Sequence, residues 1–250
     1  GIVGAEVAAK SAPDGYTLMM APQAAISINP SVYKKLPYDP LRDYDAVTQI
    51  TSGAYMLVIH PSIPAKTVPE FIALAKKRPG DINYASTGAN NLLAMEMFNH
   101  MAGVNIVHVA YKGTAPAITE LIAGQVQIVF STIAPSLPHV KTGKLRALGV
   151  TSLKRLKLVA DTPTVAESGL PGFEVENWQG IVVSAKTPAA IIDRLHGEIT
   201  KLLVHPEMIN ALVVQGLDAV NMTPQAFNQL IKSEIDKWRK VVQAANIRVE

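Results

Sequence analysis

The fold is decided by residues 82–116, which read INYASTGANNLLAMEMFNHMAGVNIVHVAYKGTAP. A short apolar run at 82–85 predicts a strand, and the small polar residues at 86–91 predict a loop after it. Apolar residues at helical spacing follow, and Gly103 ends that helix before a second strand and a second polar loop. Polar loops that connect parallel strands to helix N-termini bind anions, because unpaired N–H groups and the helix dipole face the ligand. The 86–91 loop contains no strong nucleophile or general base, which indicates binding without chemistry.

The composition is that of a globular chain with a sizeable core. Its 250 residues fit one large α/β domain or two smaller ones, and 48% of them are hydrophobic while only 17% are charged. The net charge of +3 is mild, so the balance does not indicate nucleic acid as a partner. The chain has no Cys, which excludes thiol catalysis, disulfides and thiolate metal sites.

The chain also lacks the signals of membrane insertion. No window approaches the roughly 18–20 apolar residues that a membrane span needs. The sequence opens with GIVGAEVAAK, which has neither the basic nor the apolar region of a signal peptide. We therefore expect this sequence to be a truncated or processed piece whose native N-terminus lies upstream.

Strands and helices alternate along the chain. A helix is expected at 5–10, a strand at 16–20, a loop at 21–27, and further strands at 47–50, 55–60, 126–130, 145–150 and 180–183. Thr67 and Glu70 form a capping box, and Thr114 is expected to cap a later helix. Two long helices are predicted to begin at Thr187-Pro188 and at Thr223-Pro224. This alternation favours parallel sheets with helices on both faces.

Catalytic and cofactor motifs are not found. The six His residues include no pair at the i, i+4 spacing of a helical zinc site, and the HExxH, GxSxG, Walker A and GxGxxG patterns are all missing. We assign no catalytic residue, no metal ligand and no cofactor. An enzyme acting on an organic acid remains an alternative, and it would need His60 or His108 as a base within reach of a nucleophile.

Several motifs together carry a family resemblance. They are PDGYTL at 13–18, INPSVY at 28–33, LPYDP at 36–40, NYAS at 83–86, VHVAYKG at 107–113, GKLRAL at 143–148, PTVAESG at 163–169, and the helix that contains Lys237-Trp238. Over essentially its whole length, the chain resembles the substrate-binding proteins of tripartite tricarboxylate transporters, the Bug family of bacterial periplasms.

The resemblance implies a type II periplasmic-binding-protein fold, in which two α/β lobes joined by two crossing strands close on a small organic carboxylate. The crossings are expected near Met56 and Gly180, so that lobe one is 1–55 plus 181–250 and lobe two is 56–180. The expected ligand-binding residues are Ala21, Pro22, Gln23, Ser86, Thr87, Gly88, Ala89, Asn90, Asn91, Tyr111, Ser131 and Thr132. The resemblance also implies a periplasmic, monomeric protein that delivers its ligand to large and small membrane subunits. A ligand-sensing role in signalling is the alternative that the sequence leaves open.

Three departures from the family pattern bear on the ligand. Members usually begin with a strand, a Gly-rich loop and a helix that are absent from this sequence, so we expect an incomplete first sheet and pocket. The 86–91 loop is shorter than in most members and lacks their His. Ser131 stands where some members have Asp, so the expected ligand carries no amino group that must be matched.

Overall fold

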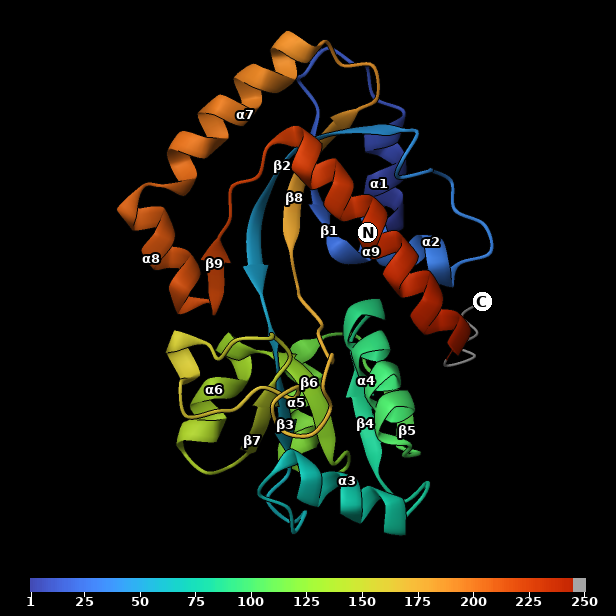
Figure 1. Ribbon diagram of the computed structural model, residues 1–250, viewed down its shortest axis with the longest axis vertical. Helices are drawn as coiled ribbons and strands as arrows, with labels where there is room; N and C mark the ends of the chain where they lie inside the picture. Colours follow the sequence, from blue (N-terminus) through green and yellow to red (C-terminus); the bar gives the residue numbers. More distant parts are fainter. Residues whose placement is uncertain (245–250) are drawn as a thin grey trace. The chain divides into compact units, whose positions relative to one another are not determined.

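The computed structural model describes residues 1–244, and the chain forms two compact α/β units. Unit 1 comprises Gly1–Ser52 and Asn177–Glu250, and unit 2 comprises Gly53–Glu176. The chain thus passes between the units at 52/53 and at 176/177. The sequence-based boundaries, after residues 55 and 180, lie three and four residues further along the chain. Each unit has its own sheet and its own apolar core (Figure 1).

The sheet of unit 1 has the strand order β1-β8-β2-β9. Its strands are β1 (Leu18–Pro22), β2 (Tyr44–Gly53), β8 (Gln179–Ser184) and β9 (Leu217–Ala219). Its helices are α1 (Ile2–Ala9), the π-helix η1 (Ala24–Ile28), α2 (Asn29–Val32), α7 (Ala189–Leu203), α8 (Pro206–Val214) and α9 (Pro224–Ala244). Because β8 is antiparallel to both β1 and β2, the carboxyl ends of β1 and β2 meet the amino end of β8 at one edge of the sheet.

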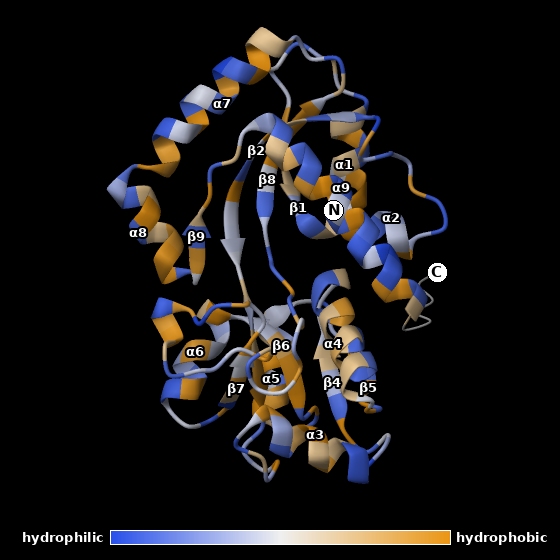
Figure 2. Ribbon diagram, viewed as in Figure 1, coloured by the Kyte–Doolittle hydropathy of each residue, from blue (hydrophilic) through white to orange (hydrophobic). Residues whose placement is uncertain are grey.

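The core of unit 1 forms between this sheet and α9. Trp178 and Phe227 are fully buried, and their rings meet edge to face with centroids 5.4 Å apart. A Cβ atom at Gly180 would lie only 2.1 Å from the Phe227 ring, so glycine is needed for the helix to approach β8. Figure 2 shows the corresponding pattern on α9, where hydrophilic and hydrophobic residues alternate around the helix.

The sheet of unit 2 has the strand order β5-β4-β6-β3-β7. Its strands are β3 (Tyr55–Ile59), β4 (Asn83–Ser86), β5 (Val107–Ala110), β6 (Ile128–Thr132) and β7 (Arg146–Val150). Its helices are α3 (Val68–Lys77), α4 (Ala89–Ala102), α5 (Thr114–Ile122), α6 (Ile133–Lys141) and the 3-10 turn η2 (Lys157–Val159). The strands β3 and β6, in the middle of the sheet, are predominantly hydrophobic (Figure 2), and the rings of Phe98, Phe130 and Phe173 pack together.

The expectation of parallel sheets is correct only for part of the unit 2 sheet, and both sheets contain antiparallel pairs. In unit 2, β4 pairs parallel with β5 and β6, but β3 is antiparallel to β6 and β7. The reason is that β3 is the strand on which the chain enters from unit 1, so it starts at the edge where β4 and β6 end. Sequence periodicity reports which faces are buried and does not report this direction of entry.

The structure confirms some of the predicted helix caps and loops and contradicts others. The capping box at α3 is confirmed, since Thr67 Oγ1 accepts a hydrogen bond from the Glu70 N–H at 3.3 Å. Thr114 is not a cap: it is the first residue of α5, and Gly113 occupies the N-cap position. The segment 21–27 is not a loop, because β1 continues through Pro22 and the π-helix begins at Ala24. Helix α8 and strand β9 were not predicted.

Candidate functional site

The candidate site lies at the carboxyl edge of the unit 2 sheet. Strands β4, β5 and β6 run in one direction, so their last residues share this edge, and α4, α5 and α6 begin directly after them. The register sets Tyr55, the first residue of β3, opposite Thr132, the last residue of β6. The carboxyl edge of a mostly parallel sheet is where α/β proteins hold their ligands.

All three helices at this edge begin without a side-chain cap. Their N-cap residues are Gly88, Gly113 and Thr132, none of which makes a side-chain cap hydrogen bond, and no first turn contains an acidic residue. Helix α3 begins at the opposite edge, and it has both a Thr67 cap and Glu70 in its first turn. Three helix N-termini without side-chain caps, with their dipoles, therefore face the carboxyl edge, which suits a bound anion.

The predicted 86–91 loop is shorter in the structure than in the sequence-based expectation. Helix α4 begins at Ala89, so that Asn90 and Asn91 lie in its first turn. The Asn91 side chain accepts a hydrogen bond from the Thr87 N–H at 3.1 Å and donates one to Thr87 Oγ1 at 2.9 Å. This reciprocal pair holds the connection between strand and helix in one conformation, which leaves Gly88 as the exposed residue.

The remaining predicted residues of unit 2 lie beside this connection. The Tyr111 N–H donates to the Ser86 carbonyl at 2.8 Å, which ties the end of β5 to the end of β4. Ser131 and Thr132 are the last residues of β6 and not a loop. The Ser131 hydroxyl is almost fully buried and donates to the Thr132 carbonyl at 2.9 Å. The structure thus brings Ser86, Tyr111 and Thr132 to the same edge.

Sequence reasoning missed two residues of this edge. The Tyr55 side chain is buried and hydrogen bonded to that of Asn90, and burial raises the pKa of its hydroxyl well above the usual range, so Tyr55 is neutral. Thr151 is fully buried, accepts a hydrogen bond from the Tyr55 N–H at 2.9 Å and donates to the Val175 carbonyl. Tyr55 could have been found as the first residue of the predicted strand at 55–60, which is the strand that enters unit 2.

Two histidines of unit 2 each lie beside a serine. His108 Nε2 is 2.6 Å from Ser86 Oγ at the carboxyl edge, and His60 Nδ1 is 2.7 Å from Ser62 Oγ at the opposite edge. The enzyme alternative required a base within hydrogen-bond reach of a nucleophile, and both pairs satisfy that distance. The distance alone does not define catalysis, because a nucleophile also needs a bound substrate and a group that orients the base.

The residues predicted in unit 1 have structural contacts of their own. Ala21 and Pro22 belong to β1, and their backbones pair with Gly180 and Gln179 of β8. The Gln23 amide is fully buried and donates to Glu234 of α9, so it fixes the turn from β1 into the π-helix. Glu234 also accepts a hydrogen bond from the Trp238 indole at 3.0 Å. Gln23 was expected to bind ligand as part of a 21–27 loop, and the sequence gives no sign that Glu234 lies beside it.

Unit 1 also contains buried polar atoms that the described part of the chain leaves without a hydrogen bond. They are Ser27 Oγ, Gln49 Oε1, Thr51 Oγ1 and Trp178 Nε1. Gln49 and Thr51 pair with Gly180 and Gln179, Trp178 directly precedes β8, and Ser27 lies in the π-helix that follows β1. All four residues therefore belong to one end of the sheet, where the chain leaves for unit 2.

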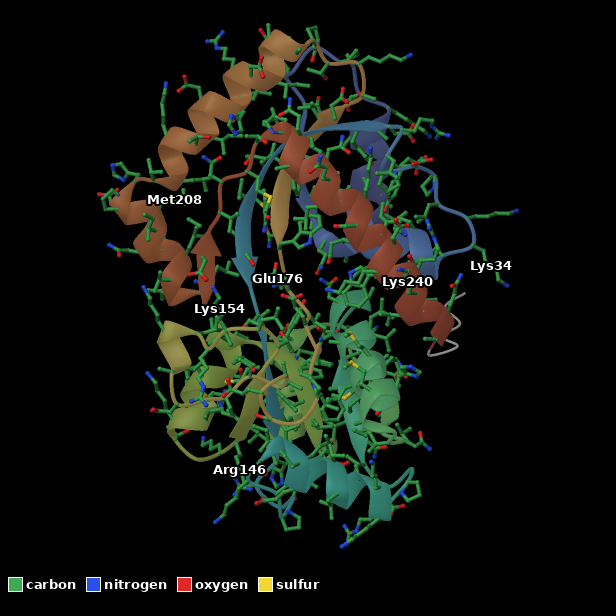
Figure 3. All side chains as sticks on the ribbon, viewed as in Figure 1. Lys34, Arg146, Lys154, Glu176, Met208 and Lys240 are labelled. Atoms are coloured by element: carbon green, nitrogen blue, oxygen red, sulfur yellow. The ribbon has the colours of Figure 1, made fainter. Side chains whose placement is uncertain are left out.

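A groove of about 660 Å³ crosses the opposite edge of unit 2, and the guanidinium of Arg146, which lines it, is engaged within the protein. Arg146, at the amino end of β7 (Figure 3), donates to the carbonyls of Ile63 and Ala65 at 3.2 and 2.7 Å. The helix that opens onto this groove is α3, whose first turn is capped. Residues 1–244 contain no cluster of His, Asp or Glu that could hold a metal ion, and none of the helices described is long and apolar enough to cross a membrane.

Two α/β units, one of which has three uncapped helix N-termini at a sheet edge, are typical of a ligand-binding protein, and the comparisons give its family. The chain belongs to the family described as tripartite tricarboxylate transporter family receptor, whose sequence model matches residues 1–247. Members of this family are periplasmic solute-binding receptors and not enzymes, so the receptor prediction is confirmed and the enzyme alternative is wrong.

Relatives with names and structures agree with this assignment. BugT of Bordetella pertussis is 30% identical and covers 100% of this chain, which spans 78% of BugT. A protein from the tcbD-tcbE intergenic region of a Pseudomonas species is 31% identical over 97% of this chain and 73% of its own length.

Solved structures match over nearly the full chain. An R. palustris protein solved with adipate has a TM-score of 0.91 and 30% identity, covering 100% of this chain and 84% of its own. MatC from Rhodopseudomonas palustris, with bound malate, has a TM-score of 0.85 and 28% identity, covering 96% and 84%.

Proposed function

We propose that this protein captures a small organic carboxylate at the carboxyl edge of unit 2 and delivers it to the membrane subunits of a tripartite transporter. The observation that carries the proposal is the set of three helix N-termini, those of α4, α5 and α6, which meet at one sheet edge without side-chain caps or acidic residues. The residues that we assign to the ligand in unit 2 are Ser86, Thr87, Gly88, Ala89, Asn90, Asn91, Tyr111, Ser131 and Thr132.

Neutral donors suit a receptor that must release its ligand. Backbone N–H groups and hydroxyls form charge-assisted hydrogen bonds to a carboxylate, and they do so without burying a second ion. The relatives solved with adipate and with malate support a dicarboxylate as the ligand class. In unit 1 we assign the ligand contacts to the backbone of Ala21, Pro22 and Gln23. The Gln23 side chain is not included, because it donates a hydrogen bond to Glu234.

We assign a ligand without an amino group. An ammonium group at this edge would need a carboxylate partner, and Ser131 supplies only a hydroxyl that already donates to the Thr132 carbonyl. Glu176 also lies near this edge, since it bridges to Ala54, but it is engaged in further interactions. Succinate should therefore bind more tightly than aspartate, and the reverse order in calorimetry would contradict the assignment.

The proposed function also requires a compartment and a membrane partner. We infer that the protein acts in the periplasm as a monomer and docks to large and small membrane subunits. The family description, a receptor of a tripartite transporter, supports the docking. Ligand sensing for a signalling system is the second candidate, and loss of carboxylate uptake in a deletion strain would favour transport over sensing.

The direct test is isothermal titration calorimetry of the purified chain with adipate and with malate. We expect saturable binding of at least one of them and no binding of adipamide, which has the length of adipate but no negative charge. A melting temperature that rises with the concentration of the bound acid would give independent support, because the ligand then stabilises the folded state. Equal binding of adipate and adipamide would overturn the anion site.

A further inference from the structure

His108 lies at the carboxyl edge, and the proposed function does not use it. The register of the parallel pair sets His108 of β5 beside Tyr84 and sets Ser86 beside Ala110. The imidazole therefore reaches along the strand pair to the last residue of β4, where Nε2 lies 2.6 Å from Ser86 Oγ. At this distance one of the two atoms must donate a hydrogen to the other.

The direction of that hydrogen bond decides what Ser86 can offer to a ligand. A serine hydroxyl has one hydrogen and two lone pairs. If Nε2 accepts the hydrogen, Ser86 presents only lone pairs, which repel a carboxylate. If Nε2 carries a hydrogen, His108 donates to Ser86 Oγ and the serine hydrogen is free for the ligand. A protonated imidazole carries hydrogen on both nitrogens, so it always enforces the second arrangement.

The groups around His108 influence whether its imidazole is neutral or protonated. Its ring lies against the Tyr84 ring, with centroids 5.1 Å apart and planes at 32°, and the Tyr84 hydroxyl donates to Glu96 of α4. His108 is partly exposed, and the partial burial of its ring lowers its pKa, while the negative charge of Glu96 acts in the opposite direction. His108 is therefore mainly neutral at pH 7 in the free protein. A carboxylate bound on the far side of Ser86 adds a second negative charge and raises the pKa of His108 in the complex.

We propose that His108 is a positioning residue that turns Ser86 into a hydrogen-bond donor, and that carboxylate binding therefore tightens as the pH falls. The inference rests on the proposed function, since it needs a carboxylate beside Ser86. By linkage, a group whose pKa rises on binding takes up protons from solution when the ligand binds. The effect is confined to the range between the pKa of His108 in the free protein and its pKa in the complex.

The first measurement uses the unmodified chain and adipate as the probe. Calorimetry between pH 8.5 and pH 6.0, where the carboxylates of adipate stay largely ionised, should show roughly tenfold tighter binding at the lower pH. Titrations at pH 7 in two buffers of different ionisation enthalpy should show net proton uptake. Zero uptake together with a flat pH profile would overturn the inference without any variant.

The second measurement assigns the effect to His108. The variant His108→Gln keeps a donor at this position but cannot titrate, so adipate binding should persist with its pH dependence removed. The matched control is His60→Gln, which alters the other histidine–serine pair at the opposite edge of the same sheet and should retain the wild-type pH profile. Circular dichroism would establish that both variants fold, and His108→Asn would replace His108→Gln if that variant fails.

The outcomes separate this inference from the proposed function. If adipate and malate fail to bind the wild-type chain at any pH, the proposed function fails. If adipate binds and His108→Gln keeps the wild-type pH profile, the carboxylate site stands and the role of His108 is wrong.

Discussion

The two units differ in how the polar side chains at one end of each sheet are hydrogen bonded. At the carboxyl edge of unit 2, side chains satisfy one another: Thr87 pairs with Asn91, Tyr55 with Asn90, and Ser86 with His108. The starts of α4, α5 and α6, in contrast, have no side-chain cap hydrogen bond. A site of this kind is rigid before the ligand arrives, so little conformational entropy is lost on binding.

The corresponding end of unit 1 is arranged differently. There the buried atoms Ser27 Oγ, Gln49 Oε1, Thr51 Oγ1 and Trp178 Nε1 have no partner among the residues that the structure describes. The side chain of the neighbouring Gln23 is hydrogen bonded, since its amide donates to the buried Glu234. A polar side chain is therefore not by itself a sign of a binding site. In unit 2 the polar side chains hydrogen bond to one another and hold the backbone donors in place.

Replacement of Glu234 should have the largest effect. The change Glu234→Ala removes the carboxylate to which the buried Gln23 amide and the buried Trp238 indole N–H donate, so we expect a loss of about 3 kcal/mol of folding stability. Chemical denaturation monitored by circular dichroism would measure it. The control is Asp236→Ala on the same helix, whose ion pair with Arg239 is exposed and contributes little. Equal stability of the two variants would show that Gln23 is not held by Glu234.

The change Gly88→Asp should separate stability from binding in unit 2. Gly88 is the N-cap of α4 with extended backbone (φ 166°), and a Cβ there meets nothing within 4 Å, so aspartate fits. An N-cap aspartate should stabilise α4 by about 1 kcal/mol. The same negative charge would repel a carboxylate, and we expect roughly 100-fold weaker adipate binding in calorimetry.

The control for this prediction is Gly88→Ser, which caps the helix without a charge. It should give a similar gain in stability and a much smaller loss of affinity. If Gly88→Asp binds adipate as well as the wild type does, the ligand does not lie at the N-terminus of α4.

Two threonines give a matched test of the contrast between the units. Thr151 Oγ1 makes two hydrogen bonds in unit 2, whereas Thr51 Oγ1 is buried without a partner in the described residues of unit 1. The change Thr151→Val should therefore cost about 2 kcal/mol, while Thr51→Val should be neutral or slightly stabilising. A large loss from Thr51→Val would indicate that its hydroxyl is satisfied by ordered water or by ligand, and adipate titration of that variant would distinguish the two.

The sequence was sufficient where a feature depends on local order along the chain. The cap of α3 by Thr67 and the start of α9 at Pro224 follow from residues next to one another, and both were predicted. The end of β4 was predicted at residue 85, one residue before its observed end at Ser86. The α/β class and the receptor family also followed from the sequence.

The sequence was insufficient where residues far apart meet. The antiparallel direction of β3, the Gln23–Glu234 pair and the approach of His108 to Ser86 depend on strand order and register. Periodicity reports which face of an element is buried but not which element covers that face. For the same reason the ligand residues predicted in the 86–91 segment were named as a loop, although half of that segment is the first turn of α4.

The smallest expected effect concerns exposed ion pairs, one in each unit. Arg42 hydrogen bonds to Asp43 in unit 1 and lowers the pKa of that carboxyl, and Arg155 lowers the pKa of Glu167 in unit 2 in the same way. A carboxyl whose pKa is lower in the folded state contributes stability above its unfolded pKa of about 4, and this contribution disappears as the pH falls through the folded pKa.

The variants Arg42→Gln and Arg155→Gln should therefore differ from the wild type only slightly at pH 7 and should match it near pH 2. Because water screens both pairs, we expect shifts in the urea midpoint close to the error of the measurement. Urea denaturation at both pH values would check this. A clear loss in one variant only would mean that one unit depends on its surface charges, and the contrast between the units would then extend beyond their buried polar groups.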